Sequence, residues 1–187
     1  AREFSYRFRE LNASSSVDRD WRDWAETYSE LVDWELRLRD AGEIGLVASL
    51  ETLLDEFRRE FGHFVVDRYG DWVNGAGDRP PLSVDLVPQF LTPMLDDQHH
   101  VLFVIIDCLR LDQWRTLLPL IAANAEVEEA LYYSILPTAT PYSRNAIFSG
   151  MYPDEIAEMN PAWWAREAEG SLNNFEDQLF EAQIRRL

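Results

Sequence analysis

The chain has 187 residues, of which 47% are hydrophobic and 13% aromatic, enough to bury one or two hydrophobic cores. It carries 34 Asp and Glu against 17 basic residues, all of them Arg, and its net charge of −17 disfavours duplex nucleic acid as a partner. The single Cys108 excludes a disulfide framework and a cysteine zinc site. Since there is neither a signal peptide nor a long apolar run, we expect a cytoplasmic protein that is not inserted into a membrane.

The acidic, Lys-free composition has two explanations, and both stay open. A heavily acidic surface keeps proteins hydrated in salt-rich cytoplasm, which would make this a halophile protein. A generic acidic protein from a genome that favours Arg codons would have the same composition.

The N-terminal third has the pattern of a small antiparallel helical bundle. Large apolar residues recur every three or four positions over 21–38 and again over 47–64, with charged residues between them. Asp18 or Asp20 is placed to cap the first helix, and Gly42 to end it. The segment FSYRFREL, residues 4–11, predicts a third helix. We interpret the aromatic stripes as core, and assign residues 1–73 to a helical bundle domain.

A cluster of Gly and Pro at residues 74–81 indicates a linker, which we extend over 74–98. The apolar run VLFVII at 101–106 then predicts a strand buried on both faces, and LYYSIL at 131–136 a second strand. Helical spacing over 109–124 lies between them. Strand, helix and strand form a βαβ unit, so the sequence predicts an α/β domain with a mainly parallel sheet over residues 99–187.

Chemistry in open α/β sheets gathers at the carboxyl ends of the strands, which here means Asp107 and the loop 137–141. Asp107 ends the first strand, where a carboxylate can either bind a divalent cation or cap the following helix. Both roles are compatible with its position.

Thr140 precedes Pro141, a pairing typical of a helix N-cap followed by the first helical residue. A hydroxyl at that place also lies beside free backbone N–H groups and the positive end of the helix dipole, which stabilise a phosphate. Threonine becomes a nucleophile only when a base takes its proton or a metal binds its oxygen. Arg144, one turn further on, can contact a phosphate or pair with a carboxylate.

These residues resemble a known family. The strand ending at Asp107, the segment CLRLDQWR after it and SILPTATPYSRNAIFSGMYP at 134–153 are similar to the PglZ domain of the alkaline phosphatase superfamily. The segment DWAETYSELVDWELRL at 23–38 resembles the bundle of PorX-type response regulators, in which a receiver domain, a bundle and a PglZ domain follow one another. The resemblance implies a fragment that lacks the receiver and the C-terminal part of the PglZ domain.

The resemblance also implies roles for the candidate residues. Thr140, Gly150, Tyr152 and Pro153 stand in the register of the phosphodiesterase branch, which makes Thr140 the nucleophile and leaves Thr138 a supporting loop residue. Asp107 and Thr140 would bind a metal, normally one of two zinc ions. Substrate binding by Arg144 is expected from its position one turn into the helix. The chain departs from that branch at Ser143, where the branch has Asn, and at Asn160, which falls one residue early.

Two functions follow from this resemblance. In the first, the intact protein is a metal-dependent phosphohydrolase, a phosphodiesterase acting on nucleotides or oligonucleotides through a phospho-threonine, switched by a cognate histidine kinase. The fragment itself is then expected to bind metal weakly and to hydrolyse little. In the second, the domain is a non-catalytic signalling scaffold that binds a transcription or secretion-system partner. In either case the bundle is a candidate homodimer contact.

Overall fold

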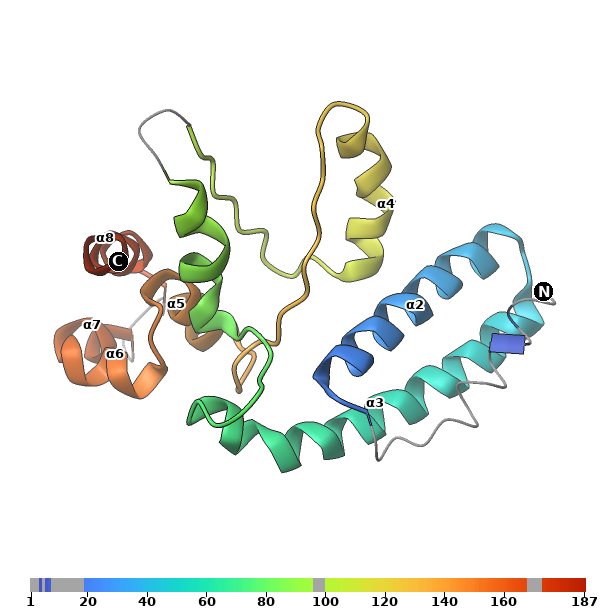
Figure 1. Ribbon diagram of the computed structural model, residues 1–187, viewed down its shortest axis with the longest axis horizontal. Helices are drawn as coiled ribbons and strands as arrows, with labels where there is room; N and C mark the ends of the chain where they lie inside the picture. Colours follow the sequence, from blue (N-terminus) through green and yellow to red (C-terminus); the bar gives the residue numbers. More distant parts are fainter. Residues whose placement is uncertain (1–3, 5, 8–18, 96–99, 168–172) are drawn as a thin grey trace. The chain divides into compact units, whose positions relative to one another are not determined.

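The computed structural model describes residues 4, 6, 7, 19–95, 100–167 and 173–187. The chain divides into two compact units, one formed by Ala1–Pro80 and Cys108–Glu129, the other by Pro81–Asp107 and Ala130–Leu187. Regular secondary structure in the described residues is helical, and Figure 1 shows it in chain order. Each helix in this part of the chain is too short or too polar to cross a lipid bilayer.

The first helix of the bundle, α2, spans Trp21–Asp40 and begins where the sequence predicts. Asp20 is its N-cap: one carboxylate oxygen accepts hydrogen bonds from the N–H groups of Arg22 and Asp23 at 2.7 and 3.0 Å. The Asp23 carboxylate accepts in turn from the N–H of Asp20 at 2.9 Å. This reciprocal capping box satisfies three backbone donors that have no partner inside the helix.

The second helix, α3, spans Ile44–Val73 and is longer than the apolar spacing over 47–64 indicates. It follows α2 after a short turn in which Gly42 has a φ of 70°, a conformation that glycine adopts without strain. Contacts between α2 and α3 bury one apolar core, so the predicted helical bundle is confirmed for these two helices. Its buried members are Phe4, Trp24, Leu31, Leu38, Leu50, Leu53, Leu54 and Phe57.

The centre of this core is the indole of Trp24, which is 1% exposed. Its ring lies 4.9, 5.7 and 5.6 Å from the rings of Phe57, Phe61 and Phe64, which recur along one face of α3. Tilted aromatic pairs at these distances add to the apolar burial. The aromatic stripes are therefore core, as their helical spacing predicts. Of the predicted helix at 4–11, only Phe4, Tyr6 and Arg7 are described, all helical; the remainder lies outside the described residues.

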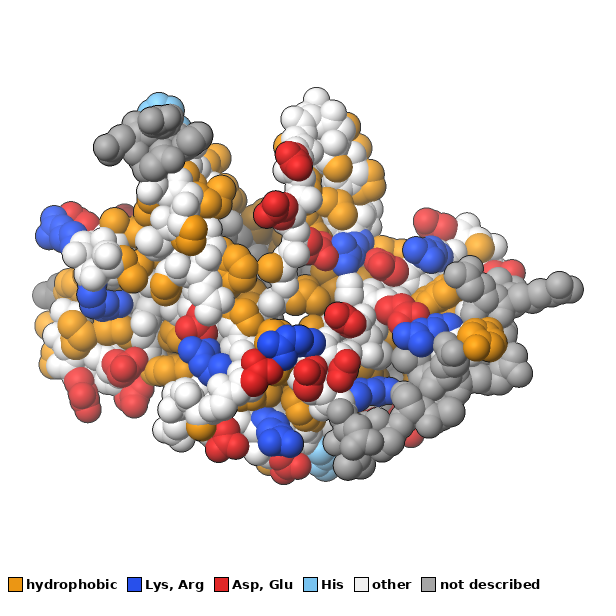
Figure 2. Space-filling view, viewed as in Figure 1, with side chains coloured by type: hydrophobic (Ala, Val, Ile, Leu, Met, Phe, Trp, Pro, Cys, Tyr) orange, Lys and Arg blue, Asp and Glu red, His pale blue; other side chains and the backbone are white. Residues whose placement is uncertain are grey.

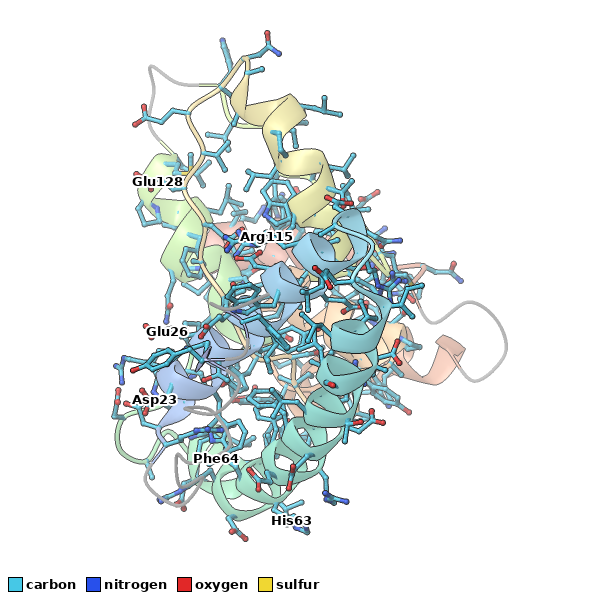
Figure 3. All side chains as sticks on the ribbon, turned by 90° about the vertical axis from the view of Figure 1, so that its right-hand side faces the viewer. Asp23, Glu26, His63, Phe64, Arg115 and Glu128 are labelled. Atoms are coloured by element: carbon cyan, nitrogen blue, oxygen red, sulfur yellow. The ribbon has the colours of Figure 1, made fainter. Side chains whose placement is uncertain are left out.

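The helix α4, Leu111–Ala122, also belongs to the first unit and contacts α2. Arg115 of α4 joins it to α2, because its Nη2 donates to the Ser29 hydroxyl at 2.7 Å and its Nε lies 3.2 Å from the Asp33 carboxylate. Figure 3 labels Arg115 on α4. The expected βαβ unit is thus wrong for the described structure, since the helix placed inside it packs on another helix rather than on a sheet.

The strands expected at 101–106 and 131–136 are likewise absent from the described structure. Its β-pairing is one isolated parallel bridge between Leu82 and Tyr133. Leu102 and Val104, expected to be buried, are 87% and 61% exposed. A strand exists only where neighbouring backbone completes the hydrogen-bond ladder, and no described segment pairs with residues 101–106. Apolar sequence is therefore insufficient to form a strand here.

The second unit is built from short helices and buries an apolar cluster around Met151, Ile156 and Leu179. Ser83 links two of its segments, because its buried hydroxyl accepts the N–H of Ile135 at 3.1 Å. The helical segments of this unit are η2 (Ser83–Asp85), η3 (Val87–Leu91), η4 (Thr92–Met94), α5 (Thr140–Ser149), α6 (Pro153–Met159), α7 (Pro161–Glu167) and α8 (Glu176–Arg186).

An ion pair between Arg7 and Glu30 ties the described N-terminal residues to α2. The guanidinium donates twice to the Glu30 carboxylate, at 2.7 and 2.8 Å. Hydrogen bonding from Arg7 lowers the pKa of Glu30, although partial burial acts in the opposite direction. A carboxyl whose folded pKa is lowered stabilises the protein above its unfolded pKa and loses that contribution as the pH falls.

We predict that Glu30→Gln lowers the free energy of unfolding by less than about 1 kcal/mol at pH 7, because the pair is partly exposed. The deficit should vanish as the pH falls below about 4.3 and towards the lowered pKa, where the wild-type carboxylate becomes protonated. Urea unfolding between pH 3 and pH 7 measures this. Glu26→Gln, an exposed position on the same helix, is the matched control and should leave the pH profile unchanged. A Glu30→Gln deficit that persists undiminished at pH 3 would contradict the assignment.

Candidate functional site

Asp107 lies in the second unit, directly after the extended apolar run at 101–106. Its side chain is 45% exposed, so the carboxylate is accessible to a ligand. The chain turns sharply here, since the next residue, Cys108, has a φ of 58°, which non-glycine residues seldom adopt. The turn places Asp107 at the end of the run, as the sequence predicts, although the run is not a strand.

The start of α5 differs from the expected N-cap. Thr140 is the first helical residue and Ala139 is the N-cap, because the Ala139 carbonyl accepts the N–H groups of Tyr142 and Ser143, each at 3.0 Å. Pro141 has no N–H, so this helix start offers fewer free donors to an anion than expected. The prediction that the Thr140 hydroxyl caps the helix is therefore wrong for this structure.

The hydroxyl of Thr140 faces Asp107 instead. Its Oγ1 donates to Asp107 Oδ2 across 3.4 Å, the long end of the hydrogen-bond range. The structure thus brings together two residues that lie 33 positions apart in the sequence. A base at hydrogen-bond reach of a hydroxyl is the arrangement that nucleophilic catalysis requires.

Arg144, on the next turn of α5, also points toward Asp107. Its Nη1 lies 3.6 Å from Asp107 Oδ2, and its Nη2 donates to Glu176 Oε2 at 2.6 Å. Arg144 therefore pairs with carboxylates, one of the two roles left open by the sequence. Glu176, at the start of α8, was missed by the sequence analysis. It lies 32 positions from Arg144, and an acidic residue in the first turn of a helix is too common to indicate a site.

The other end of α5 is closed by α8. The Gln183 carboxamide, oriented to satisfy its hydrogen bonds, donates to the carbonyls of Ile147 and Phe148 and accepts the N–H of Gly150. Arg186 donates to the Ser149 carbonyl at 2.6 Å. These bonds satisfy the last carbonyls of the helix, which have no partner within it. Side chains of α8 therefore hold α5 at Arg144 and at its C-terminal end.

The residues at this place do not make a zinc centre. Catalytic zinc takes three protein ligands and keeps a fourth position open. Asp107 and Thr140 provide one carboxylate and one hydroxyl, and the described part of the chain contains no group of three His, Cys, Asp or Glu side chains able to hold a metal ion. Asp107 and Thr140, the two metal ligands that the resemblance assigns to this chain, lie together, but they are fewer than the three protein ligands of a catalytic zinc.

Comparison with known families identifies the class of protein. Residues 86–186, more than half of the chain, match the family model of the BREX system PglZ alkaline phosphatase-like domain, and the chain belongs to this family. Residues 1–73 match the PorX response regulator linker domain, which confirms the resemblance to PorX-type regulators carrying a PglZ domain. No curated protein matches the chain. The two matches indicate a phosphohydrolase-type output domain joined to a response-regulator linker.

We predict that Gly150→Ala lowers the stability of the second unit by at least about 2 kcal/mol. Gly150 has a φ of 64°, and a Cβ at this position would overlap the Gln183 carboxamide. Thermal unfolding followed by circular dichroism measures the loss. Gly62→Ala is the control of opposite sign: it lies inside α3 with no atom near its Cβ position, so the substitution should stabilise by roughly 0.5–1 kcal/mol. A melting temperature for Gly150→Ala equal to that of the wild type would contradict the packing of α8 on α5.

We predict that Glu176→Gln lowers the free energy of unfolding by about 1 kcal/mol. The substitution replaces a charge-assisted hydrogen bond to Arg144, largely shielded from water, by a neutral one. The control is Glu181→Gln on the same helix. Glu181 pairs with Arg185, but both side chains are more than 60% exposed, so Glu181→Gln should change the free energy of unfolding by close to zero. Urea titration of both variants compares the two. Equal effects would show that Glu176 does not hold Arg144.

Proposed function

We propose that the intact protein is a phosphohydrolase, and more narrowly a phosphodiesterase that acts on nucleotides or oligonucleotides. One observation carries the proposal: the Thr140 hydroxyl points at Asp107 across 3.4 Å rather than capping its own helix. A threonine oxygen that is not used for capping is available for reaction. Membership of the alkaline phosphatase-like family supports the reaction class.

The proposed chemistry is a displacement at phosphorus. The Thr140 oxygen forms a bond to the phosphorus atom, the ester bond to one alcohol breaks, and the hydroxyl proton moves to Asp107, which passes it to the departing alkoxide. Water then hydrolyses the phospho-threonine and restores the hydroxyl. Arg144 would stabilise the negative charge on the phosphate oxygens, and Glu176 would hold the guanidinium in place.

Zinc dependence remains a proposal for the intact protein, because the described residues supply too few ligands at this place. The parallel sheet belongs to the same proposal: the run at 101–106 would become a strand once neighbouring backbone pairs with it. We also propose that a cognate histidine kinase controls the output domain through the bundle, which would carry a homodimer contact.

A signalling scaffold is the second candidate function. It is favoured by the same lack of a group of three metal ligands among the described residues, as in a site that has lost its chemistry. The protein would then act by binding a transcription or secretion-system partner. The two functions differ in whether Thr140 is needed for turnover.

The test compares Thr140→Val and Thr138→Val in the intact protein, with bis(4-nitrophenyl) phosphate as substrate. Both substitutions remove one hydroxyl near the start of α5 and keep the size of the side chain. We expect Thr140→Val to lower kcat about a thousandfold or more, because the nucleophile is lost. Thr138→Val should retain turnover, since the contact of Thr138 with α5 is made by its backbone carbonyl. Unchanged turnover in Thr140→Val would refute the nucleophile, and a wild type without turnover would favour the scaffold.

A further inference from the structure

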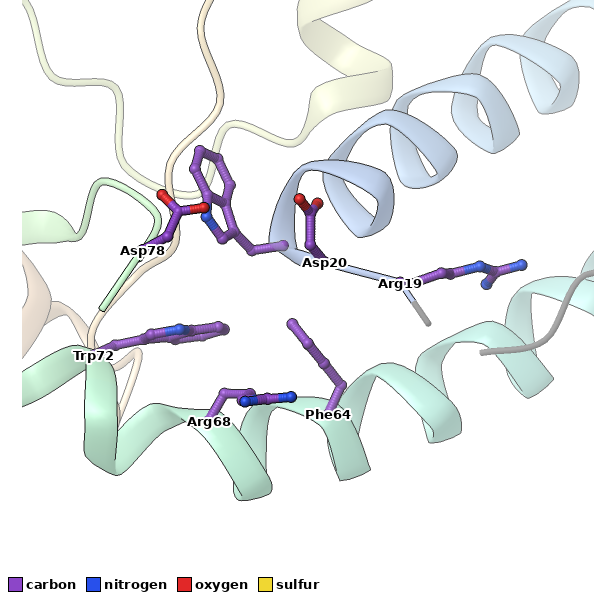
Figure 4. A pocket seen from close by; sticks show the side chains of 7 residues that line it. Arg19, Asp20, Phe64, Arg68, Trp72 and Asp78 are labelled. Carbon is purple, nitrogen blue, oxygen red and sulfur yellow. The ribbon is translucent and has the colours of Figure 1, made fainter. Parts of the chain in front are cut away.

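A pocket of about 290 Å³ lies within the first unit, formed by the start of α2, the C-terminal half of α3 and the turn after α3. Its lining residues are Arg19, Asp20, Trp21, Phe64, Arg68, Trp72 and Asp78. Figure 4 shows the side chains of Phe64, Arg68 and Trp72 arising from successive turns of α3 on one face. The volume lies near the lower end for small-molecule sites, about 300 Å³, so the pocket suits a single small ligand.

The two carboxylates of the pocket are already engaged. Asp78 accepts two hydrogen bonds from the Arg22 guanidinium, at 2.5 and 3.0 Å. Asp20 caps α2 and lies 3.5 Å from Arg22 Nη1. The hydrogen bond from Arg22 lowers the pKa of Asp78, so this carboxylate is charged and paired at neutral pH. Neither carboxylate is therefore free to bind a cationic ligand.

Arg68 is in the opposite situation. Within the described part of the chain its guanidinium forms neither an ion pair nor a hydrogen bond, although the protein has twice as many acidic as basic residues. Arg22, Arg58, Arg115 and Arg144 all pair with carboxylates. Arg68 therefore offers an uncompensated positive charge at the edge of the pocket.

Two aromatic side chains, Phe64 and Trp72, line the pocket together with Arg68. Trp72 is 4% exposed and packs edge-on against Phe64, with ring centroids 5.6 Å apart. Because the rings are inclined by 62° and fixed by packing, a planar ligand can lie on one ring with its edge toward the other, with little loss of side-chain freedom. Guanidinium groups bind carboxylates, sulfonates and phosphates through paired N–H donors.

We propose that this pocket binds a small aromatic anion, a flat ring system carrying one acidic group, with the ring against Trp72 and Phe64 and the acidic group on Arg68. This site is distinct from Thr140 and Asp107, which belong to the other unit. Ligand binding here would stabilise the bundle that links the response-regulator part to the output domain, since a ligand stabilises the state that binds it.

The experiment is isothermal titration of the chain with 2-naphthoate, and with 2-naphthylmethanol and inorganic phosphate as partial ligands. We expect one molecule of 2-naphthoate per chain, bound at least about tenfold more tightly than either partial ligand, the factor that about 1.4 kcal/mol provides. Arg68→Met should weaken naphthoate binding about tenfold, as expected for the loss of a charge-assisted contact.

The matched control is Arg59→Met, which removes the same charge from another exposed position of α3. Naphthoate affinity should stay within about twofold of the wild type, since only screened long-range attraction is lost. Unchanged circular dichroism confirms that both variants fold. Equal binding of the neutral alcohol, equal binding of phosphate alone, equal losses in both variants, or no saturable binding would each overturn the proposal.

Discussion

The packing of α8 on α5 is the contact on which the candidate site depends. One helix carries Thr140 and Arg144, and the other supplies Glu176, which accepts a hydrogen bond from Arg144, and Gln183, which contacts the last turn of α5. Without Glu176, the Arg144 guanidinium would keep Asp107 as an ionic partner, at the longer distance of 3.6 Å. The position of Arg144 relative to the threonine is thus set by a residue 32 positions away in the chain.

The same contact explains why a glycine follows α5. The chain must leave the helix in the left-handed region, and the Gln183 carboxamide occupies the space that a Cβ would need. Gln183 is 1% exposed, so its polar atoms require partners, and the end of α5 supplies them. Helix termination and inter-helix packing therefore use one set of hydrogen bonds.

Local signals in the sequence predict local structure in this chain. They fail where the structure of a segment depends on contacts with residues far away in the sequence. A cap candidate at Asp18 or Asp20 and the spacing of apolar residues in α2 suffice to predict that helix, and the structure selects Asp20. The run at 101–106 has the composition of a buried strand, but strand formation requires a second backbone, which sequence composition does not reveal. Thr140 was expected to cap because Thr and Pro are common at those positions, yet the helix has Ala139 as its N-cap and the Thr140 hydroxyl donates to Asp107. Glu176 could not be found, because its role depends on a fold contact with Arg144.

The acidic charge of the protein opposes anion binding at both proposed ligand sites. A net charge of −17 repels an approaching anion over roughly a Debye length, about 8 Å at physiological ionic strength. Figure 2 shows acidic side chains with Arg side chains interspersed, and no broad basic face on the side in view. Anion binding must therefore depend on individual guanidinium groups at short range, where hydrogen bonds outweigh the screened repulsion. Arg144 is held by two carboxylates, so it would meet a phosphate only by sharing the guanidinium with them. Arg68 pairs with no carboxylate among the described residues. An anion at Arg144 would therefore have to share the guanidinium with two carboxylates, whereas an anion at Arg68 would not.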